Sequence, residues 1–294
     1  MSLLNVELGN IGRWTEEKIF PVEASRTRAY AAATNDNHPL HVNGVLAPPL
    51  FAAVPISEHI VQALDHVVAR EDHRWGLHAE QDMYFHAPIV PGMSLRTRAA
   101  AVGVQPRPPG THVVIRTESY DHARVLLVVQ YVTLFFRRRF DGERAGEAPP
   151  DHRVPVDAKT AARSAGKVLT GTSTVDLDQT FRYAEASGDH NRIHLDQEFA
   201  ISVGLPGIIV HGMCTMAMAG RAVVRGACGD DPARLKRIAV RFARPVFPGQ
   251  TITTHVWPAG ERDGRAVFGF ETLNPDGKTV LTDGLAEVVS AGGG

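Results

Sequence analysis

This 294-residue sequence has few cysteines and almost no net charge. Its two cysteines, Cys214 and Cys228, are too few for a disulfide framework, and their spacing does not fit a zinc site. The formal net charge is −1, so no strong positive field is present that would attract a nucleic acid. These absences exclude a disulfide-stabilised scaffold and a strongly basic nucleic-acid-binding protein.

Long apolar runs are also absent. No stretch approaches the roughly 20 apolar residues that a helix needs to cross a bilayer, and the first residues lack the pattern of a signal peptide. What is present is an ordinary globular composition, with 44% hydrophobic and 21% charged residues, over about twice the length of one domain. We therefore expect a soluble, cytoplasmic protein that makes no membrane contact.

The sequence contains an internal repeat. Residues 30–41 and 183–194 align without a gap, and each segment has an aspartate followed five residues later by a histidine. A second pair of similar segments, 85–92 and 242–249, follows in the same order at nearly the same separation. Matched features in one order and at one spacing predict that the chain consists of two copies of one unit.

The segment between the two copies has the composition of a linker. Residues 137–166 contain three consecutive arginines and several prolines, with few large apolar side chains. This places an N-terminal domain at residues 1–136 and a C-terminal domain at residues 167–294.

The secondary structure expected within the copies is a few helices followed by many strands. Helical patterns cover residues 25–33 and 178–186, and period-two alternation predicts strands at 112–119, 124–136, 237–245, 252–257, 266–272 and 279–289. Residues 211–225 form a further helix, whose first ten residues are uncharged and mostly small, so it must be buried nearly all round. A long antiparallel sheet wrapped round one central helix meets this requirement. The expected fold is therefore α+β, a hotdog in each copy and a double hotdog overall.

Asp189 and His194 are the first candidates for chemistry. Gly188 allows a sharp turn after the preceding helix, which would bring the two side chains together. A carboxylate and an imidazole can bind one water and move its proton, because histidine, with an unperturbed pKa of about 6.5, gains and loses protons near neutral pH. The alternative is that Asp189 caps a helix and His194 is a buried structural histidine. Asn191 and a His-Gly pair downstream favour the functional interpretation.

That pair, His211–Gly212, opens the buried helix. The first N–H groups of a helix have no internal partner and lie at its positive end. Glycine would let a ligand carbonyl approach, and one such donor to an oxyanion contributes about 3–4 kcal/mol. The alternative is that Gly212 only relieves crowding at the helix start.

Residues 183–194, which end in Ser-Gly-Asp-His-Asn-Arg-Ile-His, resemble the signature of MaoC-like, type-2 enoyl-CoA hydratases. The spacing to His211–Gly212 and the segment Pro-Val-Phe-Pro-Gly are similar as well. The resemblance covers nearly the whole chain, because family members of this size are double hotdogs with a degenerate first half. One departure is Arg192, where the family usually has proline, which changes the rigidity of the loop but removes no catalytic group.

The resemblance implies that Asp189 and His194 are the catalytic pair, that Asn191 supports them, and that the Gly212 N–H forms the oxyanion hole. The implied reaction is the reversible hydration of trans-2-enoyl-CoA or acyl-carrier thioesters to (R)-3-hydroxyacyl thioesters, with no metal or redox cofactor. The implied partner is a small acyl thioester. Whether two such two-repeat chains pair further as a homodimer stays open at this point.

Two other functions stay open at this point. A hotdog acyl-CoA thioesterase would also use an oxyanion hole but would release a free thiol. A non-catalytic acyl-CoA-binding module would bind an enoyl-CoA without changing its absorbance.

The first copy retains the pair as Asp36 and His41, but lacks its surroundings. His38 and Asn35 stand where the second copy has asparagine and glycine, and Pro48–Pro49 would withhold N–H donors near the helix start. We therefore expect one active site, in the second copy. By resemblance, the first copy would accommodate the acyl chain or pantetheine.

Two further signals have structural interpretations. His59, His66 and His73 recur every seven residues, about 10.5 Å apart along a helix, which is too far for one metal ion to bridge and predicts a solvated helix face. Cys214 lies among apolar residues and is expected to be a small core residue rather than a nucleophile.

Overall fold

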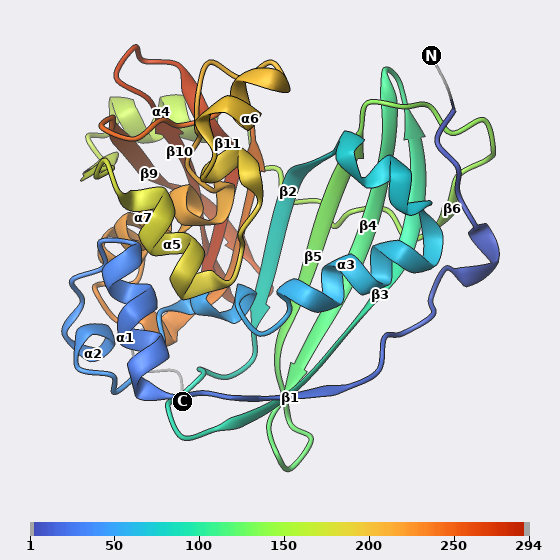
Figure 1. The fold of residues 1–294 in the computed structure, drawn as a ribbon. Helices are drawn as coiled ribbons and strands as arrows, with labels where there is room; N and C mark the ends of the chain where they lie inside the picture. Colours follow the sequence, from blue (N-terminus) through green and yellow to red (C-terminus); the bar gives the residue numbers. More distant parts are fainter. Residues whose placement is uncertain (1–2, 291–294) are drawn as a thin grey trace. The chain divides into compact units, whose positions relative to one another are not determined.

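The computed structural model describes residues 3–290 and divides the chain into two compact units. The first unit contains the residues up to Pro21, together with Pro55–Ala87 and Ser94–Asp151. The second unit contains Val22–Val54, Pro88–Met93 and the residues from His152 onward. Each unit has its own antiparallel sheet (Figure 1).

The sheet of the first unit has the strand order β1-β3-β4-β5-β2, and the short β6 pairs with β3. Helix α3 packs on β3 and β4 (Figure 1). Apolar residues of these elements, among them Ala63, Val113 and Phe136, form a core from which water is excluded. The elements are η1 (Leu8–Asn10), β1 (Lys18–Pro21), α3 (Ser57–Val67), η3 (Arg70–Trp75), β2 (Gly76–Phe85), β3 (Ser94–Arg107), β4 (Gly110–Tyr120), β5 (Leu126–Phe136) and β6 (Ala145–Gly146).

The sheet of the second unit has the strand order β8-β11-β10-β9-β7. Helix α7 contacts all five of these strands, so the sheet curves round it. The elements are α1 (Ala24–Ala33), α2 (Pro39–Val42), η2 (Pro49–Ala53), α4 (Ala158–Ser164), β7 (Leu169–Thr174), α5 (Gln179–Ser187), η4 (Arg192–His194), α6 (Gln197–Ser202), α7 (Gly212–Ala227), η5 (Pro232–Arg234), β8 (Leu235–Phe242), β9 (Thr251–Arg262), β10 (Arg265–Leu273) and β11 (Thr279–Val288).

The buried helix predicted at 211–225 is confirmed as α7. All seven residues from Cys214 to Gly220 are buried, as a helix that is apolar nearly all round requires. A side chain at Gly220 would bring its Cβ to 2.9 Å from the Leu50 side chain of η2, so any larger residue here would require Leu50 to shift. Burial of α7 on all sides fixes its N-terminus, where the candidate site lies.

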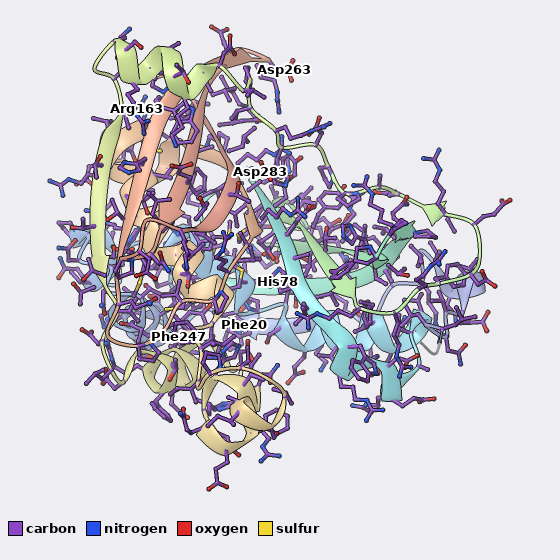
Figure 2. The ribbon with its side chains drawn as sticks, turned by 90° about the horizontal axis from the view of Figure 1, so that it is seen from above. Phe20, His78, Arg163, Phe247, Asp263 and Asp283 are labelled. Carbon is purple, nitrogen blue, oxygen red and sulfur yellow. The ribbon has the colours of Figure 1, made fainter. Side chains whose placement is uncertain are left out.

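The predicted strands correspond to β4, β5 and β8–β11, and a turn at residues 274–277 joins β10 to β11. Two long strands, β2 and β3, were not predicted. The expected linker 137–166 is not unstructured throughout, because it contains β6 and α4. In Figure 2, Arg163 marks α4, which packs on β9, the strand that ends next to the turn at Asp263.

The compact units do not follow the expected repeat boundaries, because residues 22–54 associate with the second unit. The predicted domains at 1–136 and 167–294 follow the two sequence repeats and not the compact units, and this division stays a prediction. Between residues 3 and 290, no helix combines the length and apolarity needed to cross a membrane.

The expectation of a solvated helix face with three histidines is wrong. His59 is 1% exposed, and its two ring nitrogens lie 2.8 Å from Thr15 Oγ1 and 3.0 Å from Thr97 Oγ1. Helix α3 ends at Val67, so His73 lies in the separate η3. A seven-residue spacing of histidines does not show whether a helix face is exposed or buried. A buried histidine ring can form hydrogen bonds with hydroxyl groups inside the core.

Candidate active site

The loop that carries the Asp-His motif of the second repeat begins at a left-handed turn. Helix α5 ends at Ser187, and Gly188 has φ of +79°, a conformation that favours glycine. The Asp189 carboxylate then accepts a hydrogen bond from the Asn191 N–H at 3.1 Å, and Asn191 Oδ1 accepts one from the Ile193 N–H at 3.3 Å. Asn191 thus caps η4, the turn on which His194 lies.

His194 is oriented by a backbone carbonyl. Its Nδ1–H donates to the Ile209 carbonyl oxygen at 2.8 Å, because a carbonyl can only accept. In the neutral ring, Nε2 therefore carries the lone pair. Burial lowers the pKa of His194 below its usual 6.5, and the Ile209 hydrogen bond and the Asp189 charge only partly oppose this effect. His194 is therefore a neutral base at neutral pH.

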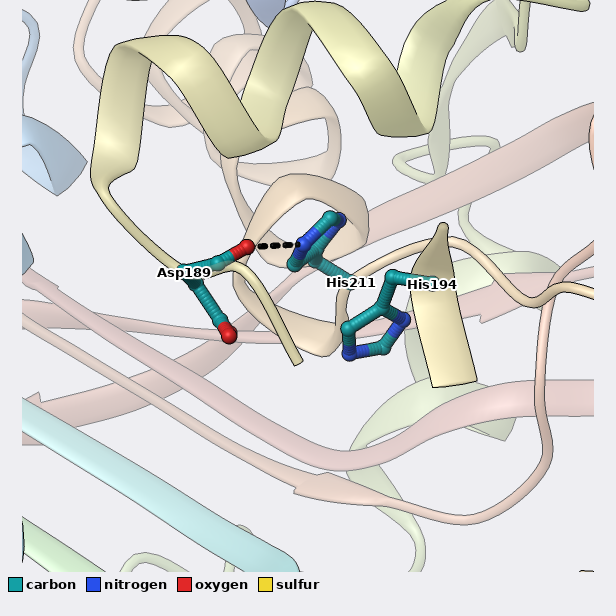
Figure 3. Close-up of side chains that lie close together, drawn as sticks. All are labelled: Asp189, His194 and His211. Atoms are coloured by element: carbon teal, nitrogen blue, oxygen red, sulfur yellow. Dashed lines mark hydrogen bonds between the residues drawn. The ribbon is translucent and has the colours of Figure 1, made fainter. Parts of the chain in front are cut away.

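His211 also belongs to the site, and the sequence did not reveal its role. Its Nε2–H donates to the backbone carbonyl of Asp189 at 2.9 Å (Figure 3). Its ring stacks on that of His194, with centroids 3.8 Å apart and an interplanar angle of 28°. Burial and the neighbouring His194 lower the pKa of His211 to about 4. In the sequence, the His-Gly pair marks the position of His211, but only its glycine suggested a role.

Gly212 is the first residue of α7, so its N–H has no carbonyl of the helix to bond. A Cβ at this position would lie 3.1 Å from the Phe242 ring. Packing against Phe242 is thus one reason for a glycine at this position. The oxyanion-binding role of its N–H stays a prediction.

Asp189, His194 and His211 each offer an atom within 4.8 Å of the others, which raises the question of a metal ion. The hydrogen bonds to Ile209 and Asp189 occupy one nitrogen of each ring. The remaining lone pairs lie in the planes of two rings that stack at 28°, a geometry that is unfavourable for both nitrogens to bind one ion. The cluster is better suited to holding a water molecule and moving a proton.

The first repeat uses the same residues with different hydrogen bonds. Asn35 takes the place of Gly188 and also has a positive φ, +53°. His41 Nδ1 lies 2.7 Å from the Asp36 carboxylate, and the whole pair is buried. Here the carboxylate binds the imidazole itself.

The backbone shows which residues of the first repeat correspond to His211 and Gly212. The Ala47 N–H bonds the Ile89 carbonyl, just as the Val210 N–H bonds the Val246 carbonyl in the second repeat. The next two positions are therefore equivalent, and Pro48–Pro49 replaces His211–Gly212. Proline has no N–H, so the first repeat has no counterpart of the proposed oxyanion donor.

The Asp36 carboxylate is also paired with a cation from the second repeat. Arg221 of α7 lies 3.4 Å from Asp36 and forms a second ion pair with Asp230. A small cavity of about 10 Å³, room for about one water molecule, lies beside this cluster. His41 Nε2 lies in its wall, buried and without a hydrogen-bond partner among the described residues.

Comparison with known proteins identifies the family. Residues 159–275 match the MaoC like domain, and residues 9–126 match the FAS1-like dehydratase domain region. A Mycobacterium tuberculosis protein named 3-hydroxyacyl-thioester dehydratase Y is 35% identical over 227 residues, 73% of each chain. The Arabidopsis thaliana protein named enoyl-CoA hydratase 2, peroxisomal, is 28% identical over 228 residues, 76% of this chain and 74% of that protein. The chain belongs to the MaoC-like dehydratase family.

Solved structures agree on the fold. A MaoC-like dehydratase from Phytophthora capsici superposes with a TM-score of 0.81 at 23% identity, over 97% of this chain and 98% of that one. A Mycobacterium tuberculosis protein described as a double hotdog gives a TM-score of 0.59 at 15% identity, over 98% and 96% of the two chains. The predicted α+β double hotdog is therefore confirmed.

Proposed function

We propose that the protein catalyses the reversible hydration of trans-2-enoyl thioesters to (R)-3-hydroxyacyl thioesters. The observation that carries this proposal is the neutral His194, whose Nδ1–H is bound to Ile209 and whose Nε2 is left as a base close to the Asp189 carboxylate. The names of the two relatives, an enoyl-CoA hydratase and a 3-hydroxyacyl-thioester dehydratase, describe the two directions of this reaction.

The proposed reaction begins with a water molecule held between Asp189 and His194. As the water oxygen bonds to C3 of the substrate, Nε2 of His194 takes one of its protons. The electron pair of the double bond moves toward the thioester carbonyl, whose oxygen becomes enolate-like. C2 then receives a proton on the same face, so one water has supplied the hydroxyl on C3 and the hydrogen on C2.

The Gly212 N–H is proposed to bind the enolate-like oxygen. It lies at the N-terminus of a 16-residue helix, whose dipole favours negative charge there. Asn191 does not contact the reacting atoms in this scheme, and it fixes the turn that carries His194 through its bond to the Ile193 N–H.

A panel of trans-2-enoyl-CoAs of increasing chain length tests the proposal. Hydration removes the conjugated double bond, so the absorbance of the enoyl thioester should fall, and a chiral analysis should give the (R)-alcohol. A thiol reagent added to the same assay detects hydrolysis. Release of thiol without loss of the double bond would instead indicate a thioesterase, and binding without either change would indicate an acyl-CoA-binding module.

Three expectations accompany this function as proposals. The reaction requires no metal or redox cofactor, the protein acts in the cytoplasm, and two chains associate into a homodimer of two-repeat subunits. Light scattering on the purified chain tests the last of these directly.

A further inference from the structure

We propose that His211 is a positioning residue that keeps Asp189 and His194 apart and correctly oriented for the reaction. This inference rests on the proposed function. It assigns to His211 a role that neither the motif nor the family comparison supplies.

The first part of the argument concerns the backbone of Asp189. This residue is exposed and follows the left-handed Gly188, so packing does not fix it. Instead both of its backbone polar groups are bonded, because its N–H donates to Ser187 Oγ at 3.2 Å and its carbonyl accepts from His211 Nε2 at 2.9 Å. Ser187 ends α5, the helix from which the loop leaves, whereas His211 ties the loop to the start of α7, which is distant in sequence.

The second part concerns the ring of His194. His211 lies face to face with it at 3.8 Å and also contacts the Tyr183 ring, with centroids 4.8 Å apart. Both histidines and Tyr183 are buried, so the His194 ring has little freedom to turn away from the Ile209 carbonyl. His211 therefore contacts both members of the proposed catalytic pair, and its own helix carries Gly212.

The first repeat shows what happens where this histidine is missing. Pro48 occupies the equivalent position and offers neither a ring donor nor an aromatic face. There the carboxylate of Asp36 bonds directly to the imidazole of His41 at 2.7 Å. Both carboxylates accept a bond from the backbone N–H two residues on, that of His38 or Asn191, but in the second repeat the imidazole bonds to Ile209 and not to the aspartate. The presence of His211 thus coincides with the separated arrangement that leaves the imidazole free to act on water.

Two substitutions separate the two contacts of His211. His211→Phe keeps a ring against His194 but removes the bond to Asp189, whereas His211→Gln keeps an N–H that can reach the Asp189 carbonyl but removes the ring. We expect His211→Phe to lower kcat about 10- to 100-fold with KM changed less than about threefold, because small misplacements of catalytic groups cost rates of this size. His211→Gln should recover part of the kcat that His211→Phe loses.

The matched control is His38 of the first repeat. Its Nε2 also donates to a backbone carbonyl, that of Asp230, at 2.9 Å, and its ring lies 4.6 Å from that of His41. His38→Phe should therefore disturb packing in a comparable way and leave kcat near the wild-type value. Equal losses in His38→Phe and His211→Phe, or no loss in His211→Phe, would overturn the proposal.

A second readout does not depend on turnover. NMR titration of the His194 ring in the absence of substrate should give a higher midpoint in His211→Gln than in the wild type, because water would reach the face that His211 covers. The same titration in His38→Phe should match the wild type. An unchanged midpoint in His211→Gln would show that His211 does not position His194. If no enoyl thioester is hydrated by the wild type, the proposed function fails, and the titration still decides whether His211 orients this ring.

Discussion

In the first repeat, Nδ1 of His41 lies 2.7 Å from the carboxylate of Asp36. In the second repeat the equivalent histidine bonds to a backbone carbonyl and the equivalent aspartate bonds to a backbone N–H. One sequence pattern, an aspartate and a histidine five residues apart, thus produces two hydrogen-bond arrangements in one chain. Only the second leaves the carboxylate exposed and available to a substrate or a water.

The difference between the two repeats predicts which histidine is needed for catalysis. His194→Gln should lower kcat for enoyl-CoA hydration by about 10³-fold, the size expected for loss of a general base, and Asp189→Asn should act similarly. His41→Gln, the same change in the first repeat, should leave most of the activity. The measurement is the initial rate of absorbance loss at saturating enoyl-CoA. Equal losses from His41→Gln and His194→Gln would mean that both repeats are catalytic.

The buried network around Asp36 predicts a large effect on stability. Asp36 accepts hydrogen bonds from the His38 N–H and from His41, and it faces Arg221 at 3.4 Å. Asp36→Ala should lower the free energy of unfolding by about 3 kcal/mol, because it leaves buried partners unpaired. Urea unfolding measures this.

A suitable control for Asp36 is an exposed aspartate that also pairs with an arginine. Asp178 lies 3.0 Å from Arg182, and its side chain is 64% exposed. Asp178→Ala should cost no more than about 0.5 kcal/mol. Similar losses in the two variants would contradict the structural role given to the Asp36 network.

The depressed pKa of His211 predicts how stability depends on pH. The pKa is about 4 in the folded protein, against 6.5 for an unperturbed histidine. Between pH 6.5 and 4 the unfolded chain binds a proton that the folded protein does not, so stability falls as the pH is lowered through this range. His194, whose pKa is also lowered, acts in the same direction.

Urea unfolding of the wild type and of His211→Gln at a series of pH values checks this prediction. The variant lacks the titrating ring, so its stability should change less between pH 6.5 and 4. Parallel curves for the two proteins would show that His211 is not kept neutral by the fold.

Removal of metal ions should not change the rate of hydration. The rings of His194 and His211 are stacked, which is unfavourable for their free nitrogens to bind one ion together. Dialysis against a strong chelator should therefore leave kcat unchanged, and added zinc should not raise it. A loss of activity that zinc restores would show that these side chains bind a metal in the working enzyme.

Much of the fold follows from local patterns in the sequence. In β9 and β10, buried and more exposed residues alternate over part of each strand, as the hydropathy pattern of the sequence predicts. Strand β3 breaks such a pattern because its consecutive residues Ala99, Ala100 and Ala101 are all fully buried, and alanine is not a residue typical of strands. Strand β2 breaks it differently, because the buried Gln81 is satisfied by the Gln130 side chain on β5 at 3.0 Å. In both strands the missing information is the neighbour across the sheet.

The site could be predicted from the sequence only in part. The motif identifies Asp189, Asn191 and His194 as residues of one loop, and the structure places them on one turn. The orientation of His194 depends on the Ile209 carbonyl, 15 residues away in sequence, and that of Asp189 on His211, 22 residues away. Periodicity and spacing describe neighbours along one element, so contacts between loops escape them.

The Asp36–Arg221 ion pair has a consequence for how a duplicated enzyme evolves. In a symmetric dimer of identical subunits, an arginine on the central helix would face both copies of the motif and would neutralise both aspartates. In a fused chain the arginine is encoded once, so it meets one aspartate and leaves the other alone. Under the proposed single-site function, covalent fusion allowed one half to lose its chemistry and gain rigidity while the other half kept its proton-transfer groups, and neither change had to be compatible with both roles at once.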